Sequence, residues 1–546
     1  MKKLATLMLA AGMVLGSFAG AEAIDWKVKG EWIFQFGVSD GIKMVRRDRD
    51  GNKRYGNTNS QDNFNAVQRV RLQIDAVASE TLSGQVYFEI GDSHWGRLNQ
   101  GAGMNADQIV VEVKRAFIDW IVPSTDLRVR MGVQGLALPS YTFGTGVFEE
   151  DVAAVTATYK FNDNVSLTAF WARPLNDNAP AVVGRRAGQD NRNFYSKQAF
   201  YMDNLDVFGL ILPLSFDGFK ITPWGAIAAV GPDAFRDAWV DGTNAAGVAA
   251  AGWGSPGTRN TNGVFRDMAP AYFNTGRVQA GTNGPLARIN RSYATAWWAG
   301  LTGEITAADP FRIAWDANYG SIQYDKTKFL NRHGWFINVL AEYKLDWGVP
   351  GLYFWWGSGD DSNPSNGSER MPYMGNTNQN MKLSNFGFNG HYWDAVGDGR
   401  TGLDHTGTWG IGARIRDMSF IEDLKHTLRV NFFGGTNSPA MAKWITGKKW
   451  RNGPRAEGGL QTDFQTGFGS SDAATMYLTT QDYGLEINFE NVYKIYENLD
   501  MMVEVGYIHL WLDQSQAVWG AKRDVGVRGV NVTDAINANI FFRYSF

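Results

Sequence analysis

Residues 535–546, AINANIFFRYSF, are the stretch that decides the fold. Apolar and polar side chains alternate from one residue to the next, and Phe541 is the one exception. A period of two is typical of a β-strand with one apolar and one polar face. The apolar face continues to the last residue, Phe546, so it requires an apolar environment along its whole length. A second sheet or lipid could provide it.

The opposite end of the chain predicts export. Residues 1–3 are basic at two positions, residues 4–18 are apolar or small, and Ala21-Glu22-Ala23 is a small-x-small cleavage site. We interpret residues 1–23 as a secretory signal peptide that is removed before Ile24. The apolar run is too short, and too interrupted by glycine, for a spanning anchor. The chain has no cysteine, which excludes a disulfide scaffold and fits the bacterial envelope.

Composition favours a single β architecture. The net charge of −3 gives no indication of a nucleic-acid partner. Aromatic residues make up 14% of the chain, glycine occurs 63 times and charged residues reach only 20%, which favours sheets and turns. No linker or low-complexity tract divides residues 24–546, so we predict one domain. After the signal peptide, no apolar run approaches the roughly 20 residues of a spanning helix.

The alternation of the C-terminal stretch recurs in about eighteen segments, each near the length that a tilted strand needs to cross a bilayer. Short turns alternate with long connections along the chain. This rhythm predicts an all-β, antiparallel, up-and-down transmembrane β-barrel of about 18 strands, with short periplasmic turns and long extracellular loops. Pro213 and Pro223 interrupt the hairpin of residues 207–229, and without it the barrel would have 16 strands. A soluble, secreted β-sandwich is the alternative.

In hydrocarbon, a closed sheet satisfies every backbone polar group, and a cation facing the bilayer midplane costs about 2–4 kcal/mol. We therefore expect the charged residues of the strands to point into a wet lumen; they include Arg69, Arg71, Arg128, Arg130, Arg312, Glu342, Arg414, Arg429, Glu486, Glu504 and Arg543. The alternation changes parity between residues 109–113 and 116–120. This change predicts a β-bulge at Lys114-Arg115 that directs both cations inward.

The signal peptide, the Trp-rich first strand, the segment RVRMGVQ at residues 128–134 and the ending FFRYSF resemble those of Gram-negative general porins. Most closely, the chain resembles the homotrimeric outer-membrane porins of sulfate-reducing, Desulfovibrio-type bacteria. The resemblance implies a homotrimer of barrels in outer-membrane lipid. It also implies insertion by the barrel-assembly machinery, which would recognise the C-terminal Tyr544 and Phe546. Small hydrophilic solutes would diffuse passively through each pore.

In such porins the third long loop folds into the barrel. Here it would be residues 135–151, with the acids Glu149, Glu150 and Asp151 facing a basic wall. The wall residues would be Lys29, Arg69, Arg71, Lys114, Arg115, Arg128 and Arg130. Opposed charges at the narrowest point create a transverse field that favours small polar solutes. Alternatively, the acids are a solvated strand entry and the arginines form ordinary salt bridges.

We find no pattern for an enzyme or a cofactor. The six histidines lie far apart in sequence, and neither a Gly-x-Ser-x-Gly motif nor a P-loop is present. Asp360 and Asp361 could bind Ca²⁺ or form a polar turn. Lumen-parity aromatics at Tyr87, Phe170, Tyr353 and Trp355 would suit a sugar-selective channel. We therefore predict a passive diffusion porin, with a sugar-selective channel as one alternative and a secreted all-β carbohydrate-binding protein or glycosidase as another.

Overall fold

The computed structural model of the protein describes residues 24–40, 45–47, 63–96, 103–104, 111–176, 204–231, 234, 268, 292–324, 328, 331–374, 405–442, 477–513, 530–532 and 534–546. The predicted signal peptide, residues 1–23, lies outside these ranges. Nearly all described residues belong to one antiparallel sheet or to its turns.

Nineteen strands form this sheet. They are β1 (Asp25–Asp40), β3 (Asn63–Ser79), β4 (Leu82–His94), β5 (Val111–Ile121), β6 (Leu127–Ala137), β7 (Glu149–Lys160), β8 (Ser166–Leu175), β9 (Leu205–Ile211), β10 (Leu214–Phe216), β11 (Phe219–Val230), β12 (Ala294–Ile305), β13 (Phe311–Gln323), β14 (Arg332–Tyr343), β15 (Val349–Gly357), β16 (Thr408–Ile421), β17 (Leu424–Gly435), β18 (Tyr483–Tyr496), β19 (Leu499–Trp511) and β21 (Ala535–Ser545). The short strands β2 (Val45–Arg47) and β20 (Val530–Val532) pair separately.

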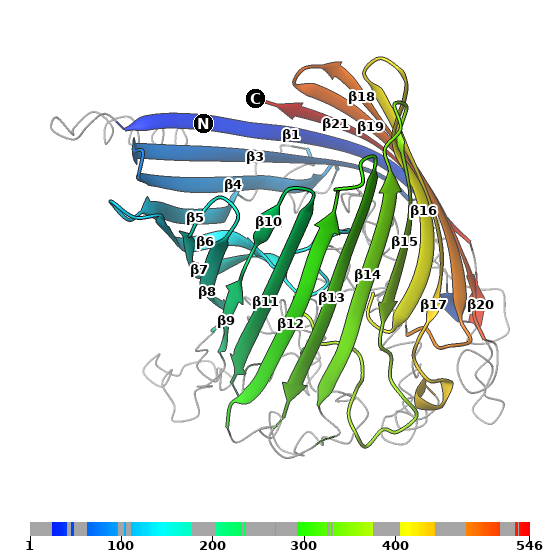
Figure 1. The fold of residues 1–546 in the computed structure, drawn as a ribbon. Coiled ribbons are helices and arrows are strands. Elements are labelled where there is room, and N and C mark those ends of the chain that lie inside the picture. The colour runs from blue at the N-terminus through cyan, green and yellow to red at the C-terminus, as the bar shows by residue number, and fades with distance from the viewer. Residues whose placement is uncertain are drawn as a thin grey trace, which may run out of the picture.

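The sheet closes on itself, as Figure 1 shows. Each strand pairs with its neighbour in the chain, and β1 pairs with both β3 and β21. β9 and β10 both pair with β11 and are separated only by Leu212 and Pro213, so they form one interrupted wall strand. The nineteen strands therefore make an 18-stranded antiparallel barrel. This confirms the predicted transmembrane β-barrel and its strand number. The 16-strand alternative is wrong.

The two prolines remain compatible with the wall because their carbonyl groups still accept hydrogen bonds. Pro213 accepts one from the Ser166 backbone at 3.4 Å, and Pro223 accepts one from the Leu212 backbone at 3.0 Å. Proline lacks only the N–H donor, so it removes one ladder bond and leaves the strand in place. The break between β9 and β10 falls at Leu212-Pro213.

Eight short connections lie at one rim, which we call the turn rim. They are residues 80–81, 122–126, 161–165, 217–218, 306–310, 344–348, 422–423 and 497–498. β1 and the C-terminus meet there, because Gly30 and Phe546 exchange backbone hydrogen bonds of 2.9 and 3.0 Å, and the Ser545 backbone N–H bonds to the turn residue Asn498. The other connections leave from the opposite rim, the loop rim. Among the described residues, no helix is long and apolar enough to span a membrane.

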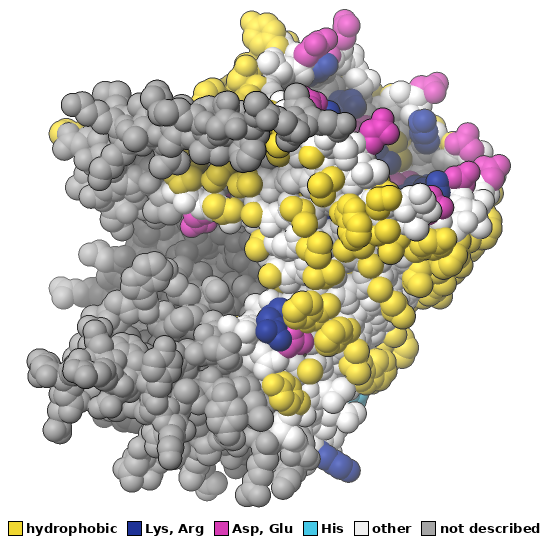
Figure 2. Space-filling view, turned by 90° about the vertical axis from the view of Figure 1, so that its left-hand side faces the viewer, with side chains coloured by type: hydrophobic (Ala, Val, Ile, Leu, Met, Phe, Trp, Pro, Cys, Tyr) yellow, Lys and Arg dark blue, Asp and Glu magenta, His cyan; other side chains and the backbone are white. Residues whose placement is uncertain are grey.

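The wall has two different faces. Large apolar side chains are exposed on the outside along many strands, including Trp26, Trp32, Trp171, Leu352 and Ile411. Figure 2 shows apolar side chains spread over the wall, with most of the charged side chains gathered near one rim. Outward apolar groups match hydrocarbon, and the closed ladder satisfies the backbone. The alternation seen in residues 535–546 thus holds around the ring.

Inward aromatic side chains pack over glycines of the neighbouring strand. Trp355 on β15 covers Gly410 on β16, and Tyr353 covers Gly412 in the same way. Trp298 on β12 lies over Gly320 on β13, with Nε1 2.7 Å from the site of a Cβ. A side chain on these glycines would collide with a ring. Bulky rings on one strand therefore lie over glycines on the next, and the rings fill this part of the interior.

Candidate functional site: the lumen and its inserted loop

Residues 138–148, which connect β6 to β7, leave the wall and contact the far side of the barrel. The Ser140 hydroxyl donates a hydrogen bond of 2.7 Å to Asp316 on β13, and the Tyr141 backbone N–H donates one of 3.0 Å to the same carboxylate. Thr142 also bonds to Asp316. The Tyr141 carbonyl accepts a bond of 2.6 Å from Arg312. One buried carboxylate therefore anchors this segment, which we call the inserted loop.

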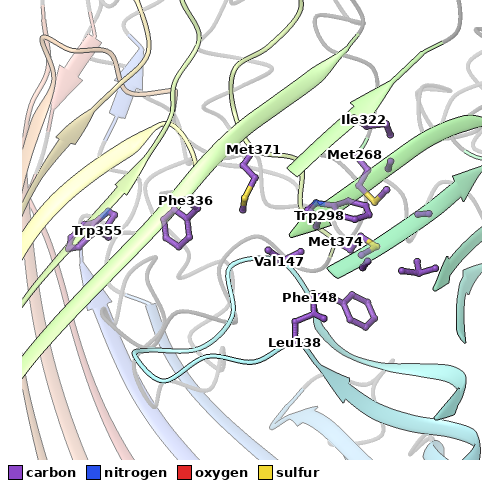
Figure 3. Close-up of a cluster of buried hydrophobic side chains, with 14 of the residues drawn as sticks. Leu138, Val147, Phe148, Met268, Trp298, Ile322, Phe336, Trp355, Met371 and Met374 are labelled. Carbon is purple, nitrogen blue, oxygen red and sulfur yellow. The ribbon is translucent and has the colours of Figure 1, made fainter. Parts of the chain in front are cut away.

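Apolar contacts hold the tip of the inserted loop. The Phe143 ring meets Tyr353 edge-on at 4.8 Å and lies 5.2 Å from the Arg414 guanidinium. Gly146 lies against Phe336, where a Cβ would come within 2.6 Å of the ring. Val147 is fully buried, and its carbonyl accepts a bond of 2.8 Å from the Met374 backbone. In the view of Figure 3, Val147 lies between Phe336 of β14 and Met374.

The acids predicted for this loop lie elsewhere. β6 extends to Ala137 and β7 begins at Glu149, so Glu149, Glu150 and Asp151 belong to a wall strand. They pair in register with Ala137, Leu136 and Gly135. Because the ladder continues through them, the inserted loop contains only uncharged residues. The prediction that the loop presents acids to the lumen is therefore wrong, because the loop presents polar and apolar side chains. The alternative, that the three acids lie at the entry of a strand, fits the structure.

The predicted bulge occurs at Lys114. Tyr87 pairs with Arg115 and the next residue, Phe88, pairs with Val113, so Lys114 is the extra residue of β5. The paired part of β5 and β6 begins at Ala116 and Val133, and residues 111–115 lie beyond it.

Residues 111–115 of β5 are not paired with β6, and we call this unpaired junction the seam. Lys114 and Arg115 bridge the seam by binding Asp151 on β7. The distances are 3.2 Å from Lys114 and 2.6 Å from Arg115, and Lys114 also lies 3.6 Å from Glu89. The Arg115 guanidinium occupies the space beside Gly135, where a Cβ would lie 2.9 Å from it. Asp151 shares its face of β7 with the exposed Ala153 rather than with the buried Val152. Arg115 is also paired with the lumen-parity Tyr87 and lies 5.8 Å over its ring, so it starts from the inward face and reaches across the seam to Asp151.

Arg69 and Arg71 on β3 form the first part of the basic wall. Arg71 binds Glu89 at 2.8 Å and Glu31 at 3.1 Å, and Arg69 lies 3.8 Å from Glu89. Lys29 is exposed on β1, where it is paired with Gln73. The carboxylates Glu31 and Glu89 thus hold the guanidinium groups in fixed positions.

Arg128 and Arg130 on β6 form the second part. Both bind the carboxylate of Asp119 on β5, Arg130 at 2.7 Å. Arg130 also lies 4.3 Å over the Phe117 ring, where a cation is attracted by the π face. Two cations share one anion here, so this position carries an excess positive charge.

Solvent reaches the two sides of the lumen unequally. The side chains of Arg71, Arg130 and Arg128 are 23%, 30% and 55% exposed. Glu486, Asn488 and Glu504 on β18 and β19 have the same inward parity but are 0% exposed. Arg71, Arg128 and Arg130 are thus open to solvent, as predicted for a wet lumen, whereas Glu486 and Glu504 are buried.

The aromatic residues predicted for the lumen and for the C-terminal insertion signal lie in two different surroundings. Among the lumen-parity aromatics, Phe170, Tyr353 and Trp355 are buried, and Tyr87 is partly buried. At the turn rim, Tyr544 stacks on Phe546 and on Trp32 of β1, and Phe546 lies tilted against Trp32.

Asp360 and Asp361, the candidate Ca²⁺ ligands, are held by protein donors. Asp360 accepts bonds from Ser368 at 2.5 Å and Tyr477 at 2.7 Å, and Asp361 accepts one from the Asn363 backbone at 2.6 Å. Within the described ranges, no group of three or more acidic or histidine residues could hold a metal ion. Burial, together with Asp360 and Asp361, raises the pKa of nearby Glu369 to about 7.

The sequence did not single out Asp316, although this residue makes the largest set of loop contacts. It follows the strand alternation at 311–323 like any other inward residue, and nothing local marks it as an anchor. Its partners Ser140 and Thr142 lie more than 170 residues away. A contact of this kind leaves no short-range pattern.

No protein-family model matches the chain, and no curated protein matches it. Solved structures of similar outline include OpdQ of Pseudomonas aeruginosa, with 10% identity, a TM-score of 0.44 and coverage of 96% of this chain and 98% of that one. OccK9 (OpdG) of the same organism has 9% identity, a TM-score of 0.47 and coverage of 96% and 99%. A loop L8 deletion mutant of OmpT, an outer membrane protein of Vibrio cholerae, has 10% identity, a TM-score of 0.36 and coverage of 95% and 99%.

The strand pairing of this chain by itself defines its class as a closed transmembrane β-barrel with a loop inserted into the lumen. The resemblance to porins of sulfate-reducing bacteria stays a prediction.

Proposed function

We propose that this protein is an outer-membrane porin of a Gram-negative bacterium, and that small hydrophilic solutes and ions diffuse passively through its lumen. The observation that carries the proposal is the unequal solvent exposure of the side chains that line the lumen. The inserted loop is bound to β13 and β15, whereas Arg128 and Arg130 on β6 remain open to solvent. A water-filled passage along β3–β6 would pass between the inserted loop and the basic wall.

The charges of this passage favour polar solutes. Arg128 and Arg130 share Asp119, so a solute meets an excess of positive charge beside an uncharged loop edge. Fixed charges in a narrow, low-dielectric passage act strongly on ions and dipoles. We expect a moderate preference for anions over cations. The inserted loop carries no acids that could create the expected transverse field, because those acids lie in β7.

A sugar-selective channel is the nearer alternative. It would need aromatic faces along the passage, but Phe170, Tyr353 and Trp355 are buried against neighbouring strands. This burial favours general diffusion. A soluble carbohydrate-binding protein or glycosidase would need its apolar side chains in an interior, whereas here Trp32, Leu352 and Ile411 are exposed outside.

Assembly is part of the proposal. Outward apolar groups would contact outer-membrane lipid, the C-terminal Tyr544 and Phe546 would be recognised by the barrel-assembly machinery, and three barrels would form a homotrimer. The short connections would face the periplasm and the long ones the exterior.

Two measurements test the proposal. A soluble protein would run at one position on a detergent gel with and without heating, whereas we expect the folded barrel to migrate differently from the heated chain. In liposome swelling, we expect entry of small sugars and amino acids at rates that fall with solute size. Entry of one sugar far above others of its size would favour the selective channel.

The passage along β3–β6 has its own variant test. Replacement of Arg128 and Arg130 by alanine should reduce the anion preference in a salt gradient, because it removes the cations that share Asp119. Lys160→Ala at the turn rim removes one exposed cation outside the passage and is the matched control. Unchanged ion preference in the double variant would contradict this route.

A further inference from the structure

An acidic pair lies on the buried side of the lumen, at Glu490 on β18 and Glu504 on β19. The two residues are directly paired across the strands. Side chains in such pairs point to the same face with Cβ atoms about 4.5–5.5 Å apart, and like charges at these positions repel. Glu490 is 4% exposed and Glu504 is 0% exposed. Water therefore screens the repulsion poorly.

The two carboxylates differ in their partners. Arg429 on β17 binds the Glu490 carboxylate at 3.1 Å and is itself buried. Glu504 makes no ion pair with any described residue. Its buried negative charge is therefore uncompensated there, which is strongly unfavourable.

Glu504 is the residue that needs a ligand. Within the described part of the chain, neither of its carboxylate oxygens has a hydrogen-bond partner. Asn539 on β21 is paired with Glu504 from the other side; its Oδ1 accepts a bond of 3.1 Å from Gln35, and its Nδ2 makes no bond to Glu504. The unpartnered carboxylate thus lies between Glu490 and Asn539, on the inward face shared by both.

A neutral acceptor lies beside the pair. Asn488 is two residues from Glu490 on the same face of β18, and its Nδ2 donates a bond of 2.9 Å to Glu486. Its Oδ1 has no partner among the described residues. Carboxylate and amide oxygens are hard ligands suited to small inorganic cations and to ammonium groups. The single negative charge of Glu504 would be matched by one positive charge.

We propose that Glu490, Glu504 and Asn488 form a binding site for one monovalent cation, either a small metal ion or an ammonium group. The bound cation replaces the missing counter-charge and ties β18 to β19 on the inner face of the wall. The site concerns the stability of the barrel and is separate from the passage along β3–β6, so it stands or falls independently of the porin proposal.

The test is the midpoint of the heat-induced mobility shift of the full-length protein in detergent. It is measured in sodium, potassium, ammonium or N-methyl-D-glucamine chloride at equal ionic strength and pH. The wild type should show a midpoint several degrees higher in at least one small cation than in N-methyl-D-glucamine, which is too large to enter. Ammonium against sodium and potassium distinguishes the two sources of the charge.

Glu504→Gln should abolish the difference between cations, because the amide removes the excess charge. In N-methyl-D-glucamine its midpoint should equal or exceed that of the wild type. Asp500→Asn is the control, since Asp500 has the same parity on β19 but is partly exposed and already bound to Arg543 at 3.1 Å. It should retain the cation dependence.

If Glu504→Gln fails to fold, the wild type still decides the question. Its midpoint should rise and saturate with the concentration of the preferred cation at constant ionic strength. A wild-type midpoint that is the same in all four salts would overturn the proposal and indicate a proton in place of the cation. Full retention of the cation effect in Glu504→Gln would also overturn it.

Discussion

The Ser140 hydroxyl donates a 2.7 Å hydrogen bond to Asp316, a residue 176 positions further along the chain. The same carboxylate accepts bonds from Tyr141, Thr142 and Thr302. It is 1% exposed, so water does not compete for these donors. This single residue therefore connects the inserted loop to β12 and β13.

Asp316→Ala should release the inserted loop. Four donors would lose their acceptor, and each buried donor left unsatisfied costs about 1–3 kcal/mol. We expect a larger and noisier single-channel conductance than in the wild type, measured in a planar bilayer. Asp346→Asn, in the short turn between β14 and β15, is the control and should leave the current unchanged. A quiet wild-type current in Asp316→Ala would show that other contacts suffice.

Gly135→Leu should weaken the seam between β5 and β6. Its side chain would enter the space of the Arg115 guanidinium and separate it from Asp151. Overpacking of this kind typically costs about 1–3 kcal/mol, so the midpoint of the heat-induced mobility shift should fall. Gly225→Ala is the matched control, because the nearest atom to its Cβ would lie at 3.8 Å. Equal midpoints for the two variants would contradict this view of the seam.

The segment of residues 358–374 should become less stable as the pH rises. Burial and two neighbouring aspartates raise the pKa of Glu369 from 4.5 to about 7. Between these values the folded segment binds more protons than the unfolded one, so stability is highest below about pH 4.5 and falls as the pH rises towards 7. The protection of this segment from hydrogen exchange, relative to the intrinsic exchange rate at each pH, should fall over that window. The loss of protection should disappear in Glu369→Gln, and its persistence there would assign it to another group.

Trp355→Ala should destabilise the barrel by about 3–5 kcal/mol, the range typical of buried aromatic truncations. The ring is fully buried over Gly410, and its removal leaves a cavity that a glycine cannot fill. Trp347→Ala removes a 41% exposed indole at the turn rim and should cost far less. Urea unfolding in detergent compares the two, and similar losses would refute the packing argument.

Alternation along the chain was sufficient to predict the strands, the closure and the bulge at Lys114, because these depend on local spacing. The same reasoning placed Glu149–Asp151 on the loop, although the ladder with β6 continues through them. It also missed Asp316 and the burial of Glu504, since both depend on segments that meet only in space. The parity of a strand residue fixes its face but not its access to water.

Single-channel recording in a planar bilayer is the most direct test of the central claim, that the lumen conducts. After addition of the detergent-purified, heat-modifiable protein, we predict stepwise, ohmic current increases with a moderate anion preference, reduced by alanine at Arg69, Arg71 and Arg130. A correctly folded, inserted barrel that gives no current at any salt concentration would contradict the account.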